Sequence, residues 1–110
     1  MTSETSDKIK AAIASVVPSA QGYTIYTSPT GFDNMEVIRV ITPAWRNLGK
    51  AERIAKVQNA VMPKLAPAEL SRIFRFSVLT PKEWETIQPQ FVGEKQRKLG
   101  YRYARAAASK

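Results

Sequence analysis

The chain has 110 residues, the length of a single domain, and it contains neither cysteine nor histidine. Disulfides, thiolate chemistry, zinc sites built from cysteine and histidine, and imidazole acid–base catalysis are therefore excluded. Seventeen lysines and arginines against nine acids give a net charge of +8, which indicates a polyanionic partner. The composition thus favours a binding module over an enzyme.

The amino-terminal residues give no sign of export. MTSETSDKIK is polar and mixed in charge, unlike a secretory signal peptide. No apolar run approaches the roughly 18 residues that a membrane-spanning helix needs. Without cysteine the fold needs no oxidising compartment, so we expect a soluble cytoplasmic protein with no membrane contact.

The first helix is predicted over Asp7–Val17, after a disordered leader at residues 1–6. Its apolar side chains recur at helical spacing and share one face. Ser6 or Asp7 is a natural N-cap, and Pro18 ends the helix.

Two strands follow, at Gly22–Ser28, which is rich in aromatic and β-branched residues, and at Met35–Thr42, which reads MEVIRVIT. The segment between them has the proline, glycine and asparagine of a turn, so we expect an antiparallel hairpin.

A second helix is predicted over Lys50–Leu65, weakening near Met62 because Pro63 interrupts it, with a further short turn from Pro67. The third strand is Ser71–Thr80. The long connection before it has room for a helical crossover, which favours a third strand parallel to the second.

The fold class is therefore α/β, more strictly α+β, with the order α-β-β-α-(α)-β. We expect a three-stranded mixed sheet with helices on one face. The domain spans residues 7–87, and residues 88–110 form a basic tail that holds six of the seventeen bases and one of the nine acids.

The closing segment carries a family resemblance. Leu79-Thr-Pro-Lys-Glu-Trp-Glu85, at the end of the third strand, resembles the strand exit of the BolA family, and the element order resembles that of type II KH folds. The resemblance covers about residues 7–86. It implies a BolA-like, KH-like domain that binds nucleic acid or a protein partner.

Two family features are missing. BolA-like proteins carry a histidine at the start of the last strand, which can ligate an iron–sulfur cluster shared with a glutaredoxin; Arg72 stands there in this chain. Around Ala51-Glu-Arg53, only the arginine of the family's helix signature remains. No cofactor, metal or iron–sulfur cluster is therefore expected.

Two basic regions are candidates for nucleic-acid contact. Lysine and arginine neutralise phosphates, and exposed aromatic rings stack on unpaired bases. The first region surrounds the second helix and the start of the third strand, at Arg46, Lys50, Arg53, Lys56, Lys64 and Arg72. The second is the tail, at Lys95, Arg97, Lys98, Tyr101, Arg102, Tyr103 and Arg105. A Gly-x-x-Gly clamp of the KH kind is absent.

Other interpretations stay open at this point. The same bases can be a solvated tail and an ordinary helix surface, and Arg39, Arg72 and Arg75 can simply face water beside the strands. Trp45 and Trp84 can anchor a partner or close the core. The rival functions are a protein-interaction adaptor of BolA type without a cluster, and a ribosome- or nucleoid-associated factor. The choice between DNA and RNA is open, and no catalytic residues are found.

Overall fold

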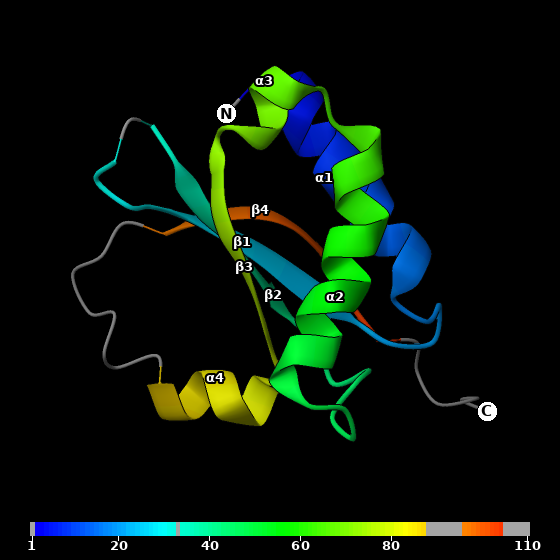
Figure 1. The fold of residues 1–110 in the computed structure, drawn as a ribbon. Helices are drawn as coiled ribbons and strands as arrows, with labels where there is room; N and C mark the ends of the chain where they lie inside the picture. The colour runs from blue at the N-terminus through cyan, green and yellow to red at the C-terminus, as the bar shows by residue number, and fades with distance from the viewer. Residues whose placement is uncertain (1, 33, 88–95, 105–110) are drawn as a thin grey trace.

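The computed structural model describes residues 2–32, 34–87 and 96–104. The elements in chain order are α1 (Ser3–Val16), β1 (Tyr23–Pro29), β2 (Glu36–Ile41), α2 (Lys50–Val61), the 3-10 turn η1 (Met62–Lys64), α3 (Pro67–Leu70), β3 (Ile73–Leu79), α4 (Pro81–Ile87) and β4 (Arg97–Arg102). Figure 1 shows their arrangement around one sheet.

The sheet is mixed and has the strand order β3-β2-β1-β4. β1 and β2 form the predicted antiparallel hairpin, with Ile25 opposite Val40. β2 and β3 are parallel, with Val40 opposite Val78, so the predicted crossover is confirmed. β4 pairs antiparallel with β1 at the other edge. Three strands consequently point in one direction and β1 in the other.

The prediction of three strands is wrong because β4 lies inside the segment taken for a tail. Arg97–Arg102 reads RKLGYR, which lacks the alternation of apolar residues that marks a half-buried strand. Edge strands commonly carry lysine and other charges, which discourage pairing with a further chain. The strand was missed because it is an edge strand of this basic kind.

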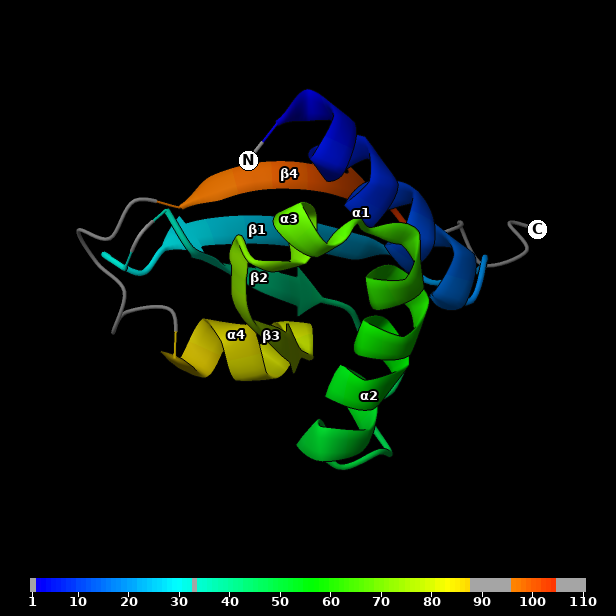
Figure 2. The ribbon, with the colours of Figure 1, turned by 45° about the horizontal axis from the view of Figure 1, so that its top comes forward.

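The helices α1 and α2 pack together on one face of the sheet and enclose the main core (Figure 2). Alternate strand residues point to that face, including Ile25, Ile38, Val40 and Val78, all at most 2% exposed. Ile9 and Ile13 of α1 and Val57 and Val61 of α2 are fully buried against them.

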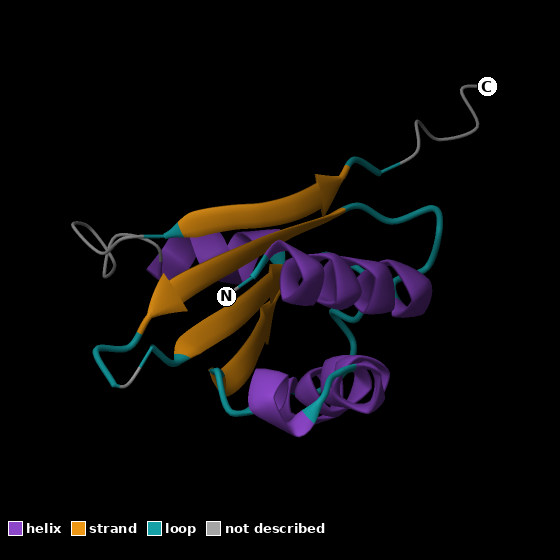
Figure 3. Ribbon diagram, turned by 90° about the horizontal axis from the view of Figure 1, so that it is seen from above, coloured by secondary structure: helices purple, strands orange, loops and turns teal. Residues whose placement is uncertain are grey.

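The expectation that all helices cover one face is also wrong, because α4 lies on the opposite face (Figure 3). Trp84 of α4 packs with Ile41 and Leu79, whose side chains point away from the main core. Trp84 and Trp45 are each 8% exposed, Trp45 as part of the main core and Trp84 as part of this second cluster.

Within the segment expected to be a disordered leader, residues 3–6 form the start of α1. Thr2 is the N-cap, and its hydroxyl accepts a hydrogen bond from the Thr5 N–H at 3.1 Å. Thr5 is only 4% exposed, and its hydroxyl donates a hydrogen bond to Glu69 of α3. This contact between segments distant in sequence leaves no local signature.

The second helix follows its prediction closely. α2 ends at Val61, η1 contains Pro63, and α3 begins at Pro67. Within the described residues, no helix is long and apolar enough to cross a lipid bilayer.

Candidate nucleic-acid interface

The sheet topology gathers three connections at one end of the molecule. Because β2, β3 and β4 run in the same direction, the residues that follow each of them lie at the same end of the sheet. Hydrogen bonds join these connections to the start of β1. The Thr42 hydroxyl donates to the Gly22 carbonyl at 2.7 Å, and Arg102 Nε donates to the Gln21 carbonyl at 3.0 Å. Arg46 and Lys50, which follow β2, and the tyrosines at the end of β4 therefore lie at the same end of the sheet.

The end of β4 exposes two tyrosines beside a lysine. Tyr101 is 53% exposed and Tyr103 is 82% exposed, and their rings meet edge to face with centroids 5.1 Å apart. The Lys98 ammonium lies 5.1 Å from the centroid of the Tyr101 ring. We call Lys98, Tyr101 and Tyr103 the tyrosine platform.

The tyrosine platform lies on the face of the sheet that α4 covers only in part. Tyr101 is opposite Thr24, and Lys98 is opposite Tyr26, whose ring packs on Trp84 of α4 at 5.6 Å. α4 thus shields the neighbouring strands, while the platform beside it stays open to a ligand.

Gly22 allows the chain after β4 to pass close to the start of β1. A Cβ atom at this position would lie 2.5 Å from the Ala104 nitrogen and 2.7 Å from the Arg102 oxygen. Both neighbours are backbone atoms, so the contact could not be relieved by a side-chain rotation. The absence of a side chain at Gly22 therefore lets the backbone that bears Tyr103 lie directly against the start of β1.

Arg102 was predicted to contact nucleic acid, but its guanidinium is bound within the protein. It donates to the carbonyls of Val17, Pro18 and Gln21 at 2.7–3.1 Å and lies 5.0 Å from the centroid of the Tyr23 ring. The five donors of arginine suit it to such a convergence of carbonyls. Arg102 therefore anchors β4 to the α1–β1 connection.

Around the start of α2, three predicted bases are exposed. Arg46 lies in the loop before the helix, Lys50 is its first residue, and Lys56 lies one and a half turns later, 6.0 Å from the centroid of the buried Trp45 ring. Among the described residues, none of the three forms an ion pair. These side chains are free to neutralise phosphates.

Arg53, the fourth base of this group, is buried and supports the structure instead. It is 5% exposed, and its guanidinium donates to the carbonyls of Trp45, Leu48 and Arg46. Its Nη1 also donates to Glu83 Oε1 at 2.6 Å, which lowers the pKa of Glu83. Arg53 was predicted to contact nucleic acid, but the structure places its guanidinium inside a loop that helical spacing did not reveal.

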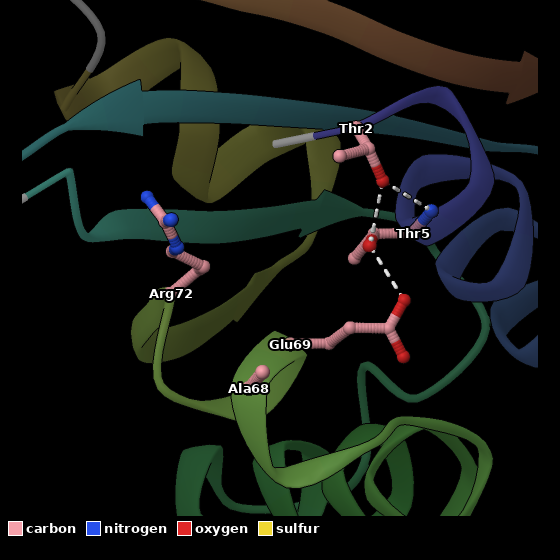
Figure 4. Close-up of a pocket in the computed structure, with 5 residues that line it drawn as sticks. All are labelled: Thr2, Thr5, Ala68, Glu69 and Arg72. Carbon is pink, nitrogen blue, oxygen red and sulfur yellow. Dashed lines mark hydrogen bonds between the residues drawn. The ribbon is translucent and has the colours of Figure 1, made fainter.

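Lys64 and Arg72 are exposed but lie apart from Arg46, Lys50 and Lys56, the predicted contacts around the start of α2. Lys64 faces Lys8 and Ser15 of α1 across a shallow hollow. Arg72 borders a pocket of about 330 Å³ between the start of α1 and α3 (Figure 4). Neither side chain belongs to the end of the sheet that carries the tyrosine platform.

The pocket beside Arg72 contains an ionised carboxylate. Glu69 accepts hydrogen bonds from the Thr5 hydroxyl at 2.6 Å, the Ala66 N–H at 2.8 Å and the Lys8 ammonium at 2.9 Å. These contacts, led by the one from Thr5, lower the pKa of Glu69 to about 2. The same contact with Glu69 raises the pKa of Lys8. In Figure 4 the Arg72 side chain points away from this carboxylate.

The remaining predicted residues divide between β4 and the undescribed segments. Arg97 is exposed at the start of β4. Lys95 and Arg105 lie outside the described residues. Within those residues, no group of acids is placed to hold a metal ion.

Arg39 departs from its expected place in water beside the strands. It is 3% exposed beneath α4, where Nη1 donates to the Ser28 hydroxyl and to Gln96 Oε1, both at 3.2 Å, and its guanidinium lies 5.3 Å from the Trp84 ring centroid. One signal for this arrangement was present in the sequence: Trp84 follows β3 closely, and so large an apolar side chain packs against a face of the sheet.

Comparisons of the chain with protein-family models, with curated proteins and with solved structures return no match. The functional argument therefore rests on the geometry of the side chains.

Proposed function

We propose that this chain is a non-catalytic binding module for single-stranded nucleic acid. The observation that supports this function best is the tyrosine platform, where two exposed rings lie beside the Lys98 ammonium on an open part of the sheet. Exposed aromatic rings offer a surface to unpaired bases, and a neighbouring cation attracts the phosphates between them.

The architecture is proposed to be of type II KH, BolA-like form. The order of the first six regular elements and the antiparallel and parallel pairings of β1–β2 and β2–β3 are compatible with it. The chain adds β4 and α4 to that plan. Because the Gly-x-x-Gly clamp is absent, we assign the nucleic acid to the tyrosine platform and not to a loop between helices.

Arg46, Lys50 and Lys56 extend the interface beyond the tyrosines. They follow β2, whose carboxyl end lies at the same end of the sheet as that of β4. Because α2 packs on the other face of the sheet, a nucleic-acid strand stacked on Tyr101 and Tyr103 would pass around this end of the sheet to reach these bases. There they neutralise its backbone without reading its sequence. Binding of this kind discriminates single strands from duplexes more than it discriminates one sequence from another.

The test is a fluorescence-anisotropy titration of the full chain against labelled single-stranded RNA, single-stranded DNA and duplex DNA. Each is measured at about 50 and about 200 mM salt, the range in which phosphate contacts weaken most visibly. We expect tighter binding to the single strands and a steep loss of affinity with salt. Absence of binding at low salt, or a preference for the duplex, would overturn the proposal.

Variants separate stacking from charge. Tyr101→Ala and Tyr103→Ala should each weaken binding by about 1–3 kcal/mol with an unchanged salt slope. Lys98→Ala should instead lower the salt slope by about one unit. Phe32→Ala is the matched control for the tyrosines, because Phe32 is 62% exposed at the opposite end of β1. Lys64→Ala is the control for Lys98.

A further inference from the structure

The free edge of β3 combines an apolar surface with a row of available backbone groups. Phe74 is 50% exposed, Met62 is 44% exposed, and the Phe32 ring stacks on Phe74 with centroids 6.1 Å apart. A groove of about 220 Å³ runs beside β3 and is lined by Met62, Leu70, Ile73 and Phe74, among others. We call this surface the β3 edge groove.

A local irregularity pushes Phe74 outward. Glu36 is opposite Ile73, but the next residue of β2, Val37, is opposite Arg75, so Phe74 has no partner in the register. An extra residue of this kind bends a strand and turns a side chain away from its regular position. The apolar surface is thus built into the strand.

The backbone direction of β3 can be deduced from one hydrogen bond. The Leu79 carbonyl accepts from the N–H of Thr42, the residue directly after β2, at 2.9 Å. Because backbone groups of alternate residues point to opposite sides of a strand, those of Phe76 and Val78 point away from β2. Among the described residues β3 pairs only with β2, so this side can accept another strand.

The charge along the edge is of one sign. Arg72 and Arg75 are exposed, no acid lies between Ser71 and Leu79, and neither arginine forms an ion pair with a described residue. Two copies of the chain paired through β3 would bring both pairs of arginines to one seam, and each copy carries a net charge of +8. Like charges opposite each other destabilise strand pairing. The edge therefore fits an acidic partner better than a second copy.

We propose that β3 binds an extended, acidic peptide segment of a partner protein by strand addition. The peptide pairs with the outward backbone groups of Phe76 and Val78, places an apolar side chain in the β3 edge groove beside Phe74, and offers carboxylates to Arg72 and Arg75. Main-chain hydrogen bonds supply affinity in this mode, and side-chain pockets supply specificity. The site is separate from the tyrosine platform and does not depend on nucleic-acid binding.

The test begins with random peptides displayed on phage and selected on the immobilised full chain, with excess single-stranded RNA present to occupy the tyrosine platform. Enriched sequences are synthesised and their binding is measured by fluorescence polarisation. We expect alternating apolar and acidic residues, and a loss of affinity of about tenfold or more in Phe74→Ser and in Arg75→Glu. Lys82→Glu, a charge reversal at an exposed position of α4, should leave affinity unchanged.

Methylation of the peptide backbone tests strand addition directly. Alternate amides of a bound strand point toward β3, so N-methylation in one register should abolish binding while the other register is tolerated. The proposal is overturned if no peptide is enriched, if the enriched peptides bind Arg75→Glu normally, or if both methylation registers behave alike. A stable dimer of the free chain that Phe74→Ser dissociates would mean that the β3 edge binds a second copy of the chain. That result would also overturn the proposal.

Discussion

Arg53 of α2 and Glu83 of α4 form an ion pair with 2.6 Å between Nη1 and Oε1, and this pair joins helices that lie on opposite faces of the sheet. The arginine side chain is 6% exposed and the glutamate 34%. Arg53 also holds the loop before α2 through three carbonyls. One side chain thus positions both the loop bearing Arg46 and the helix that covers part of the open face.

Removal of either partner should destabilise the fold. Glu83→Gln should lower the free energy of unfolding by roughly 2–3 kcal/mol, less than the 3–5 kcal/mol typical of fully buried pairs because Glu83 is partly exposed. Arg53→Lys should be similarly damaging, since lysine keeps the charge but loses the planar fork that reaches three carbonyls. Urea unfolding measures both, and Lys56→Ala, one turn along α2, is the control that should change little.

Acid should destabilise the protein through Glu69 and Glu83. The pKa of Glu69 is lowered to about 2, and that of Glu83 is lowered by Arg53. A carboxyl whose folded pKa is depressed contributes stability above its unfolded pKa, and that contribution is lost as pH falls through the folded pKa. The free energy of unfolding should therefore decline between about pH 4.5 and about pH 2.

The Glu69 contribution can be isolated with Glu69→Gln. The variant should be less stable than the parent at pH 7 and should show a shallower decline below about pH 4.5, because one titrating group is gone. Unfolding curves at pH 7, 4 and 3 give the comparison. Parallel declines in parent and variant would mean that the contacts from Thr5 and Lys8 do not hold the carboxylate ionised.

Arg102→Ala should act on stability and not on the salt dependence of binding. Its guanidinium is already bound to carbonyls of the α1–β1 connection, so its loss should cost about 1–3 kcal/mol and loosen β4. Hydrogen exchange of the β4 amides would detect this loosening. A reduced salt slope with unchanged stability would instead place Arg102 on the nucleic acid.

Gly22→Ala should displace the backbone next to Tyr103 and so disturb the tyrosine platform. The added methyl would meet backbone atoms of residues 102 and 104 at 2.5–2.7 Å, a clash worth roughly 1–3 kcal/mol if the strands must shift apart. We expect lower thermal stability together with weaker binding to single strands. Gly49→Ala is a suitable control, since the nearest atom to its added Cβ is a glutamate side-chain oxygen at 3.6 Å.

The sequence predicted the local elements well and the long-range contacts poorly. The hairpin, the crossover and the break after α2 were visible because periodicity, turn residues and Pro63 are local signals. β4 was not visible, because its register depends on β1 far away in the chain. The role of Arg102 was hidden for the same reason, since its carbonyl partners lie more than 80 residues earlier in the chain. Arg53 binds nearby carbonyls, but the conformation of the loop that presents them has no signature in the sequence.

The site was therefore predicted in part. The exposed Arg46, Lys50, Lys56, Lys98, Tyr101 and Tyr103 stay candidates, because charge and aromatic spacing can be read directly. The exposed Phe74 and the edge position of β3 could not be read, since alternation at Phe74, Phe76 and Val78 is the pattern of a regular strand with all three side chains on one face. Only the pairing with β2 reveals the irregularity at Phe74.

The pairing of Tyr23 with Arg102 has a consequence for synthesis on the ribosome. β1 emerges early, and its partner β4 follows only after the hairpin, the crossover and α4 have been made. During that interval β1 is an unprotected edge, and contacts between distant segments of this kind slow folding. The nascent domain should become resistant to protease only once Arg97–Arg102 has left the exit tunnel.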